Sequence, residues 1–165
     1  MLSGHSVGQL ALAADAGRYR LAGTLSPAPF LTGKLQRLTT PSVRVTGAGT
    51  LEQRLLDGQV TMATPELRAV AKGALDLAGN RYRAVRVGID LLQPRALFTN
   101  MSGRNVRMLW TLDGPFATAT YAYRLTSPQV AFDDTGFTDV RAEGHGPAGR
   151  PGAHRCRARR PNDDR

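Results

Sequence analysis

Few residues in this 165-residue chain carry side chains that catalysis or metal binding requires. The single cysteine is Cys156, and the three histidines are His5, His145 and His154. A zinc site takes three or four converging ligands, whereas the chain has neither a His-x-x-x-His nor a Cys-x-x-Cys spacing. A lone cysteine also excludes an intrachain disulfide. We therefore expect no metal, no cofactor and no catalytic nucleophile.

The strongest acidic candidate is the pair Asp133-Asp134, with Asp139 and Glu143 nearby. Paired carboxylates can act in acid/base catalysis or bind a hard cation. This pair stands directly before Thr135-Gly136, which is the setting of a solvated turn. The chain also lacks Gly-x-Ser-x-Gly and the glycine-lysine motif of a phosphate loop. We interpret the pair as a turn and expect a protein that is not an enzyme.

The dominant pattern of the sequence is an alternation of apolar and polar residues with period two. It is clearest in three runs, Tyr82–Leu91, Val106–Asp113 and Ala117–Thr126. Successive side chains of a strand face opposite sides of a sheet, so each run predicts a strand with one apolar face. The apolar positions of special interest are Val85, Val87, Ile89, Leu91, Val106, Met108, Trp110, Leu112, Tyr121, Tyr123 and Leu125.

Weaker alternation precedes and follows these runs, and turn residues such as Asp57-Gly58 and Gly79-Asn80 separate them. Turns at intervals of about 10–14 residues are typical of all-β proteins. Leu51–Leu56 and Thr64–Lys72 have some helical character, but we interpret both as strand or loop. The sequence therefore predicts an all-β fold, an extended antiparallel meander curled into a groove, with little or no helix. The alternative is a compact β-sandwich or barrel that serves as a binding module without catalysis, with the apolar face as its closed core.

The formal net charge of the chain is +9, from 22 Lys+Arg against 13 Asp+Glu. Residues 144–165 hold six Arg and two Asp, so almost half of the excess lies there. Such a balance is compatible with phosphate neutralisation in nucleic acids, but a GC-rich coding sequence also favours Arg. Trp110, Tyr121 and Tyr123 could stack on bases, yet their period of two favours core or groove lining. We therefore expect no nucleic-acid partner.

Composition divides the chain near Gly144. Residues 1–144 carry the strand pattern, whereas residues 145–165 have almost no large apolar side chain and predict a disordered basic tail. This tail is either a functional basic arm or the product of a shift in the reading frame. Met1–His5 has neither the basic nor the apolar region of a signal peptide, and no stretch approaches the ~20 apolar residues of a membrane span. The chain is therefore expected to be either cytoplasmic or a piece of a longer protein.

The run from Ser102 to Phe137 resembles a known family. One strand ends in Leu112-Asp113-Gly114-Pro115-Phe116, a second strand follows, and a short apolar element leads into Thr135-Gly136-Phe137. This succession resembles the repeated strands of the large TamB proteins of Gram-negative bacteria, within the AsmA-like superfamily. The resemblance is clearest over residues 82–144. The family's N-terminal membrane anchor and its C-terminal domain are absent, so the resemblance implies an internal fragment.

The resemblance implies a function in the cell envelope. TamB-like proteins are anchored in the inner membrane and cross the periplasm as a curled β-sheet with an apolar groove, which is called a β-taco. They support phospholipid transport and outer-membrane protein assembly. By analogy, the eleven apolar residues from Val85 to Leu125 would line this groove. The implied partners are phospholipid acyl chains, neighbouring β-strands of a longer chain and an outer-membrane assembly protein, and the implied location is the periplasm.

Overall fold

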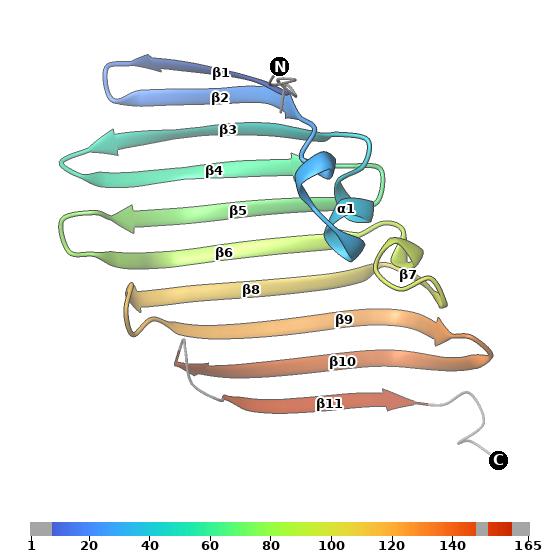
Figure 1. The fold of residues 1–165 in the computed structure, drawn as a ribbon. Helices are drawn as coiled ribbons and strands as arrows, with labels where there is room; N and C mark the ends of the chain where they lie inside the picture. The colour runs from blue at the N-terminus through green and yellow to red at the C-terminus, as the bar shows by residue number, and fades with distance from the viewer. Residues whose placement is uncertain (1–7, 148–151, 160–165) are drawn as a thin grey trace.

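A computed structural model describes residues 8–147 and 152–159 of the chain. These residues form a single antiparallel sheet of eleven strands that does not close on itself (Figure 1). Ten of the strands follow the order β1-β2-β3-β4-β5-β6-β8-β9-β10-β11, and β7 pairs with β9. The predicted all-β meander is therefore confirmed.

Most strands follow one another along the chain with short connections, but the β2–β3 connection holds η1 and α1 and the β6–β7 connection holds η2. Their bounds are β1 Gly8–Asp15, β2 Arg18–Leu25, β3 Val43–Glu52, β4 Leu55–Ala63, β5 Leu67–Asp76, β6 Arg81–Leu91, β7 Met101–Arg104, β8 Val106–Pro115, β9 Thr120–Phe132, β10 Thr135–Pro147 and β11 Ala153–Arg159. The helical elements are η1 Ala28–Phe30, α1 Gly33–Thr39 and η2 Pro94–Ala96.

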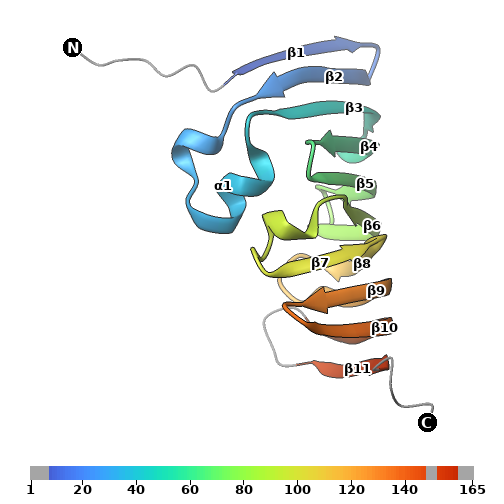
Figure 2. The same cartoon turned by 90° about the vertical axis from the view of Figure 1, so that its right-hand side faces the viewer.

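The helix α1 lies on one face of the sheet at one end of the strands (Figures 1 and 2). Leu38 of α1 is 9% exposed and belongs to the main buried cluster. The remaining members of this cluster are Leu91, Met101, Val106 and Val130. Arg37 fastens α1 to the neighbouring segment, because its Nε donates to the carbonyl oxygen of Ala96 at 3.1 Å. The fold therefore has its core at one end of the sheet.

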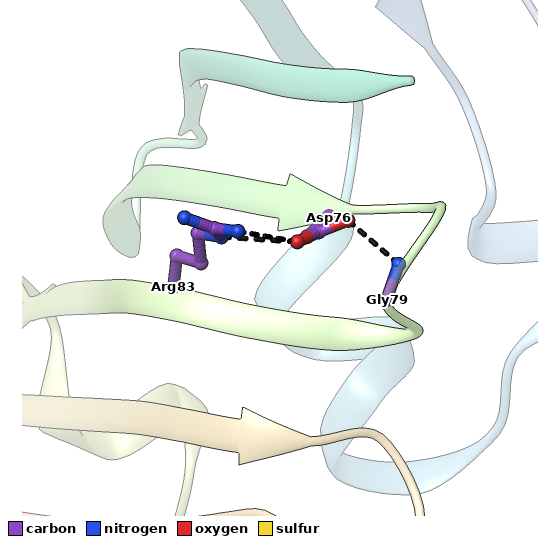
Figure 3. A network of polar contacts seen from close by, with 3 residues as sticks. All are labelled: Asp76, Gly79 and Arg83. Carbon is purple, nitrogen blue, oxygen red and sulfur yellow. Dashed lines mark hydrogen bonds and ion pairs between the residues drawn. The ribbon is translucent and has the colours of Figure 1, made fainter. Parts of the chain in front are cut away.

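The β5–β6 hairpin is closed by one carboxylate. Asp76 Oδ1 accepts a hydrogen bond from the Gly79 N–H at 2.7 Å, and Oδ2 accepts from Nη2 of Arg83 at 2.5 Å (Figure 3). The side chain of Asp76 is 14% exposed. The hydrogen bond from Gly79, followed by that from Arg83, holds the pKa of Asp76 below its ordinary value, because both favour the charged form.

One local interruption of the ladder lies next to this hairpin. Ala84 has a φ of 49° and lies where the register of β6 shifts against both neighbours. The shift removes the Ala84 N–H from the ladder, and Oδ1 of Asp113 accepts its hydrogen bond at 3.0 Å. Such a bulge increases the local twist of the strand. Here the Asp113 side chain from β8 accepts the hydrogen bond of the N–H group that the bulge leaves without a partner in the ladder.

Some local predictions are wrong. Asp57-Gly58 lies inside β4, and the β3–β4 turn is instead at Gln53-Arg54, where both residues have positive φ (46° and 65°). Positive φ angles at both residues are typical of a two-residue hairpin turn whose twist matches that of the flanking strands. Ala117 lies in the turn that precedes β9 rather than in the strand.

The two segments with helical character resolve as expected, into strand and turn. Thr64 Oγ1 accepts hydrogen bonds from the N–H groups of Glu66 and Leu67, at 3.2 and 3.0 Å, as a helix N-cap would. The chain then enters β5 at Leu67 instead of a helix. The range 51–56 spans the end of β3, its turn and the start of β4.

The expected disordered tail is not what the structure shows for its described residues. His145–Pro147 belong to β10, and Ala153–Arg159 form β11, which pairs with β10. Main-chain hydrogen bonds of a ladder need no large apolar side chain, so composition alone did not reveal this strand. The remainder of the predicted tail, residues 148–151 and 160–165, and the N-terminal Met1–His5 lie outside the described residues.

The closed architecture considered as an alternative, a sandwich or barrel, is not formed by residues 8–147 and 152–159, which make one open sheet. In this part of the chain, no helix is long and apolar enough to cross a membrane.

Candidate functional site: an apolar sheet face

Strand register places all eleven predicted groove residues on one face of the sheet, which we call the apolar face. Residues that oppose each other in a ladder share a face. The opposed pairs are Val85 and Leu112, Val87 and Trp110, Ile89 and Met108, Leu91 and Val106, Leu112 and Tyr121, Trp110 and Tyr123, and Met108 and Leu125. The three runs of alternating residues therefore combine into one continuous surface.

The apolar face extends well beyond these three strands. One row of opposed residues crosses ten strands, from β1 to β11. None of its side chains is charged, and the thiol at its end is the one group that can form a hydrogen bond. This row is Leu10, Gly23, Val45, Met62, Ala69, Ile89, Met108, Leu125, Ala142 and Cys156. Strands lie about 4.8 Å apart, so the row is about 40 Å long.

Tyrosine rings lie across glycines on this face. A Cβ atom added to Gly58 would lie 2.5 Å from the hydroxyl of Tyr19, and one added to Gly49 would lie 2.6 Å from its Cζ. Tyr19 on β2 therefore covers β3 and β4 at once, because both strands have glycine beneath it. Tyr121 covers Gly152 in the same way, at 2.6 Å from its hydroxyl. This cover shields glycine backbone that would otherwise face solvent.

An aromatic strip occupies the middle of the apolar face over β8 and β9. The ring centroid of Trp110 lies 5.9 Å from that of Tyr121 and 6.2 Å from that of Tyr123. These distances fall in the range of favourable tilted aromatic pairs. Trp110 nevertheless remains 36% exposed, so the strip presents ring surface to whatever contacts this face.

A shallow furrow with a volume of about 170 Å³ is lined by residues of β2, β4, β5 and β6. Its floor includes Gly58, Gly73 and Ala71, and Tyr19 and Val85 are among its walls. The furrow exists because neighbouring strands place small residues at opposed positions, Gly58 against Gly73. Lys72 is the one charged residue of its lining.

The cap formed by α1 covers one end of the apolar face. Leu38 contacts the cluster that holds Leu91 and Val106, which are the last apolar-face residues of β6 and the first of β8. Lys34 Nζ lies 3.7 Å from the centroid of Phe98 in the same region. The cap was not predicted from the sequence. The spacing of Leu35 and Leu38 and the Pro41 that follows the helix were its only signals.

The opposite face, which we call the polar face, is rich in arginine. The row that lies next to the all-apolar row along each strand is Gln9, Thr24, Arg44, Ala63, Arg68, Asp90, Arg107, Thr126, Arg141 and Arg157. Asp90 Oδ1 pairs with Nε of Arg107 at 2.6 Å. This row therefore carries six charged side chains, whereas the row on the apolar face carries none.

The residues with potential chemistry do not converge on one place. Asp133-Asp134 forms the β9–β10 turn, where Asp133 Oδ2 accepts from Nδ2 of Asn100 at 2.9 Å. Cys156 is exposed on β11, and His5 lies outside the described residues. Among the residues that the structure describes, no group of three or more His, Cys, Asp or Glu side chains could hold a metal ion.

Comparison of the chain with protein families, with curated proteins and with solved structures finds no match.

Proposed function

We propose that this chain is a β-groove segment of a TamB/AsmA-like envelope protein, and that its apolar face shelters phospholipid acyl chains. In this role it supports phospholipid transport and outer-membrane protein assembly without catalysis. The proposal places the protein in the periplasm, as part of a longer chain that is anchored in the inner membrane.

One observation carries this proposal, the row of ten opposed residues from Leu10 to Cys156. Ordinary single-sheet proteins cover such a face with helices or a second sheet. Here the cap over one end, centred on Leu38, is the cover that the described residues provide, while Met62 and Trp110 stay partly exposed. Transfer of each acyl CH₂ from water to such a surface contributes up to about 0.8 kcal/mol.

The edges of the sheet support the proposed continuation into neighbouring strands. β1 and β11 are the outer strands of the described sheet, and outer strands present backbone N–H and C=O groups that can pair with another strand. Addition of strands at both edges would lengthen the apolar row. An outer-membrane assembly protein as a partner rests on the family resemblance alone.

Site-specific photocrosslinking in the full chain tests the proposal. A photoreactive amino acid replaces Val87, which lies on the apolar face, or its neighbour Arg86, which lies on the polar face opposite Lys72. Each variant is irradiated with vesicles of phosphatidylethanolamine and phosphatidylglycerol, and the adducts are identified by mass spectrometry. We expect lipid adducts at position 87 in at least tenfold excess over position 86.

Equal yields of lipid adduct at the two positions would show that contact with lipid does not depend on the face. The absence of an adduct at position 87 would show that lipid does not reach the apolar face. Either result overturns the proposed function. The comparison is matched because both positions lie in the middle of β6 and differ only in the direction of the side chain.

A further inference from the structure

A hollow of about 600 Å³ lies over β8, β9, β10 and β11, and most of its lining residues are on the polar face. One row of opposed residues crosses it. Leu109 opposes Arg124, Arg124 opposes Glu143, and Glu143 opposes Arg155. Charged groups from three different strands therefore meet at one side of the hollow.

The adjacent row supplies a floor in which two alanines alternate with longer polar side chains. Thr111 opposes Ala122, Ala122 opposes His145, and His145 opposes Ala153. Because the alanine side chains end at Cβ, they leave space between the longer side chains of the first row. Leu109 is 47% exposed at the end of that row. The hollow therefore combines apolar surface at Leu109, Ala122 and Ala153 with the polar side chains of Thr111 and His145 and with a charged side, as small-molecule sites commonly do.

Positive charge exceeds negative charge around the hollow. Glu143 Oε2 lies 3.8 Å from Nε of Arg124 and 3.6 Å from Nε of Arg141. Both distances are longer than a hydrogen bond, so the carboxylate is shared loosely between exposed guanidinium groups. Arg155 opposes the same glutamate from β11. The charged residues that line the hollow, Arg124, Arg155 and Glu143, have a net formal charge of +1. Arg141 lies beside Glu143 outside this lining and raises the local formal charge to +2.

We propose that this hollow binds an organic phosphate monoester. Arg124 and Arg155 hold its phosphate group, and its apolar part lies on Leu109, Ala122 and Ala153. A phosphate monoester carries about −1.5 to −2 charges near pH 7, which matches the excess positive charge. The guanidinium fork suits phosphate oxygens because it donates two parallel hydrogen bonds. The site is on the face opposite to the proposed lipid surface and does not depend on it.

Titration of the full chain with phenyl phosphate tests this site. The readout is the NMR shift of the alanine methyl groups of Ala122 and Ala153, with inorganic phosphate as the comparison ligand. We expect saturable shifts with phenyl phosphate and at least tenfold weaker binding of inorganic phosphate, which has no apolar part.

The double variant Arg124→Gln with Arg155→Gln should bind phenyl phosphate at least tenfold more weakly than the unmodified chain. The control is Arg44→Gln, which lies on the same face but outside the hollow and should bind phenyl phosphate as the unmodified chain does.

A second variant keeps every charge and fills the space. Ala122→Leu places a larger apolar side chain on the floor, and we expect at least tenfold weaker binding of phenyl phosphate. The proposal is overturned if the unmodified chain shows no saturable shift, if phenyl phosphate and inorganic phosphate bind equally, or if the arginine double variant and Ala122→Leu both bind as tightly as the unmodified chain. None of these outcomes bears on crosslinking of lipid at Val87.

Discussion

The hydroxyl oxygen of Tyr123 lies 2.9 Å from Nδ1 of His154, and the two residues share a hydrogen bond across an intervening strand. Tyr123 belongs to β9 and His154 to β11, with Gly144 of β10 between them. The tyrosine can reach across β10 only because its opposed residue is glycine. The outermost strand is therefore joined to the sheet by a side chain as well as by its ladder.

Gly144→Ala should loosen β11. A Cβ atom at this position would lie 2.5 Å from Nδ1 of His154, 2.7 Å from Cε1 of Tyr123 and 2.9 Å from the carbonyl oxygen of Ala153. Overpacking of this kind typically costs about 1–3 kcal/mol of folding free energy. Amide hydrogen exchange of residues 153–159 should become faster in the variant.

The control for this prediction is Gly88→Ala, because an added Cβ there has no neighbouring atom within 4 Å. Exchange in β11 should be unchanged by the control. If Gly144→Ala left the protection of β11 at the level of the control, the account of how Tyr123 and His154 join the strands would be wrong.

Asp76→Asn should lower the melting temperature at pH 7 and have little effect near pH 2. The pKa of Asp76 is lowered in the folded state by the hydrogen bonds from Gly79 and Arg83. A lowered pKa stabilises the fold above the ordinary value of about 4, and that stability is lost as the pH falls through the folded pKa. Thermal melts from pH 7 to pH 2 measure the difference, and Asp57→Asn, an exposed aspartate on β4, is the control. A difference that stays constant with pH would contradict the prediction.

Leu38→Ala should destabilise the cap at the end of the apolar face. Leu38 is 9% exposed and packs in the main buried cluster, and truncation of a buried leucine costs about 2–5 kcal/mol. Leu35→Ala in the same helix is the matched control, because Leu35 is 59% exposed and its truncation should change stability by less than about 0.5 kcal/mol. Urea unfolding measures both, and equal effects would show that α1 is not anchored through Leu38.

Met62→Glu should impair lipid binding while leaving the fold intact. Met62 is 44% exposed in the row without charged side chains, so a carboxylate there is tolerated in water but opposes contact with an acyl chain. Binding of a fluorescent acyl-chain probe should weaken at least tenfold. Gln59→Glu in the same strand, opposite Lys72 on the polar face, should bind the probe as the unmodified chain does, and equal weakening in both would count against the apolar face.

The sequence predicted the apolar face more fully than it predicted the ends of the elements. Alternation in β6, β8 and β9 predicted that residues such as Val87 and Trp110 share a face, as the register has them, because the period of a strand is a local property. It could not give the opposed pairs, since register depends on turns such as Gln53-Arg54 and on the bulge at Ala84, which have no strong local signal.

Two elements were missed for different physical reasons. The seven-residue helix α1 is too short to be stable by itself and depends on the packing of Leu38 against distant strands. The strand β11 has the sequence Ala-His-Arg-Cys-Arg-Ala-Arg, whose basic character favours disorder when judged by composition. Its pairing relies on the β10 backbone and on Tyr123, and neither contribution is visible within the segment itself.

The most direct test of the central claim uses Trp110, which is the single tryptophan of the chain and lies in the middle of the apolar face. Its fluorescence is measured with phospholipids that carry bromine on the acyl chain. The control is Trp110→Phe combined with Leu109→Trp, which moves the fluorophore to the polar face. If acyl chains lie on the apolar face, brominated lipid reduces the fluorescence of Trp110 at least twofold and leaves that of the control nearly unchanged. Equal quenching in both proteins, or no quenching of Trp110, would contradict the claim.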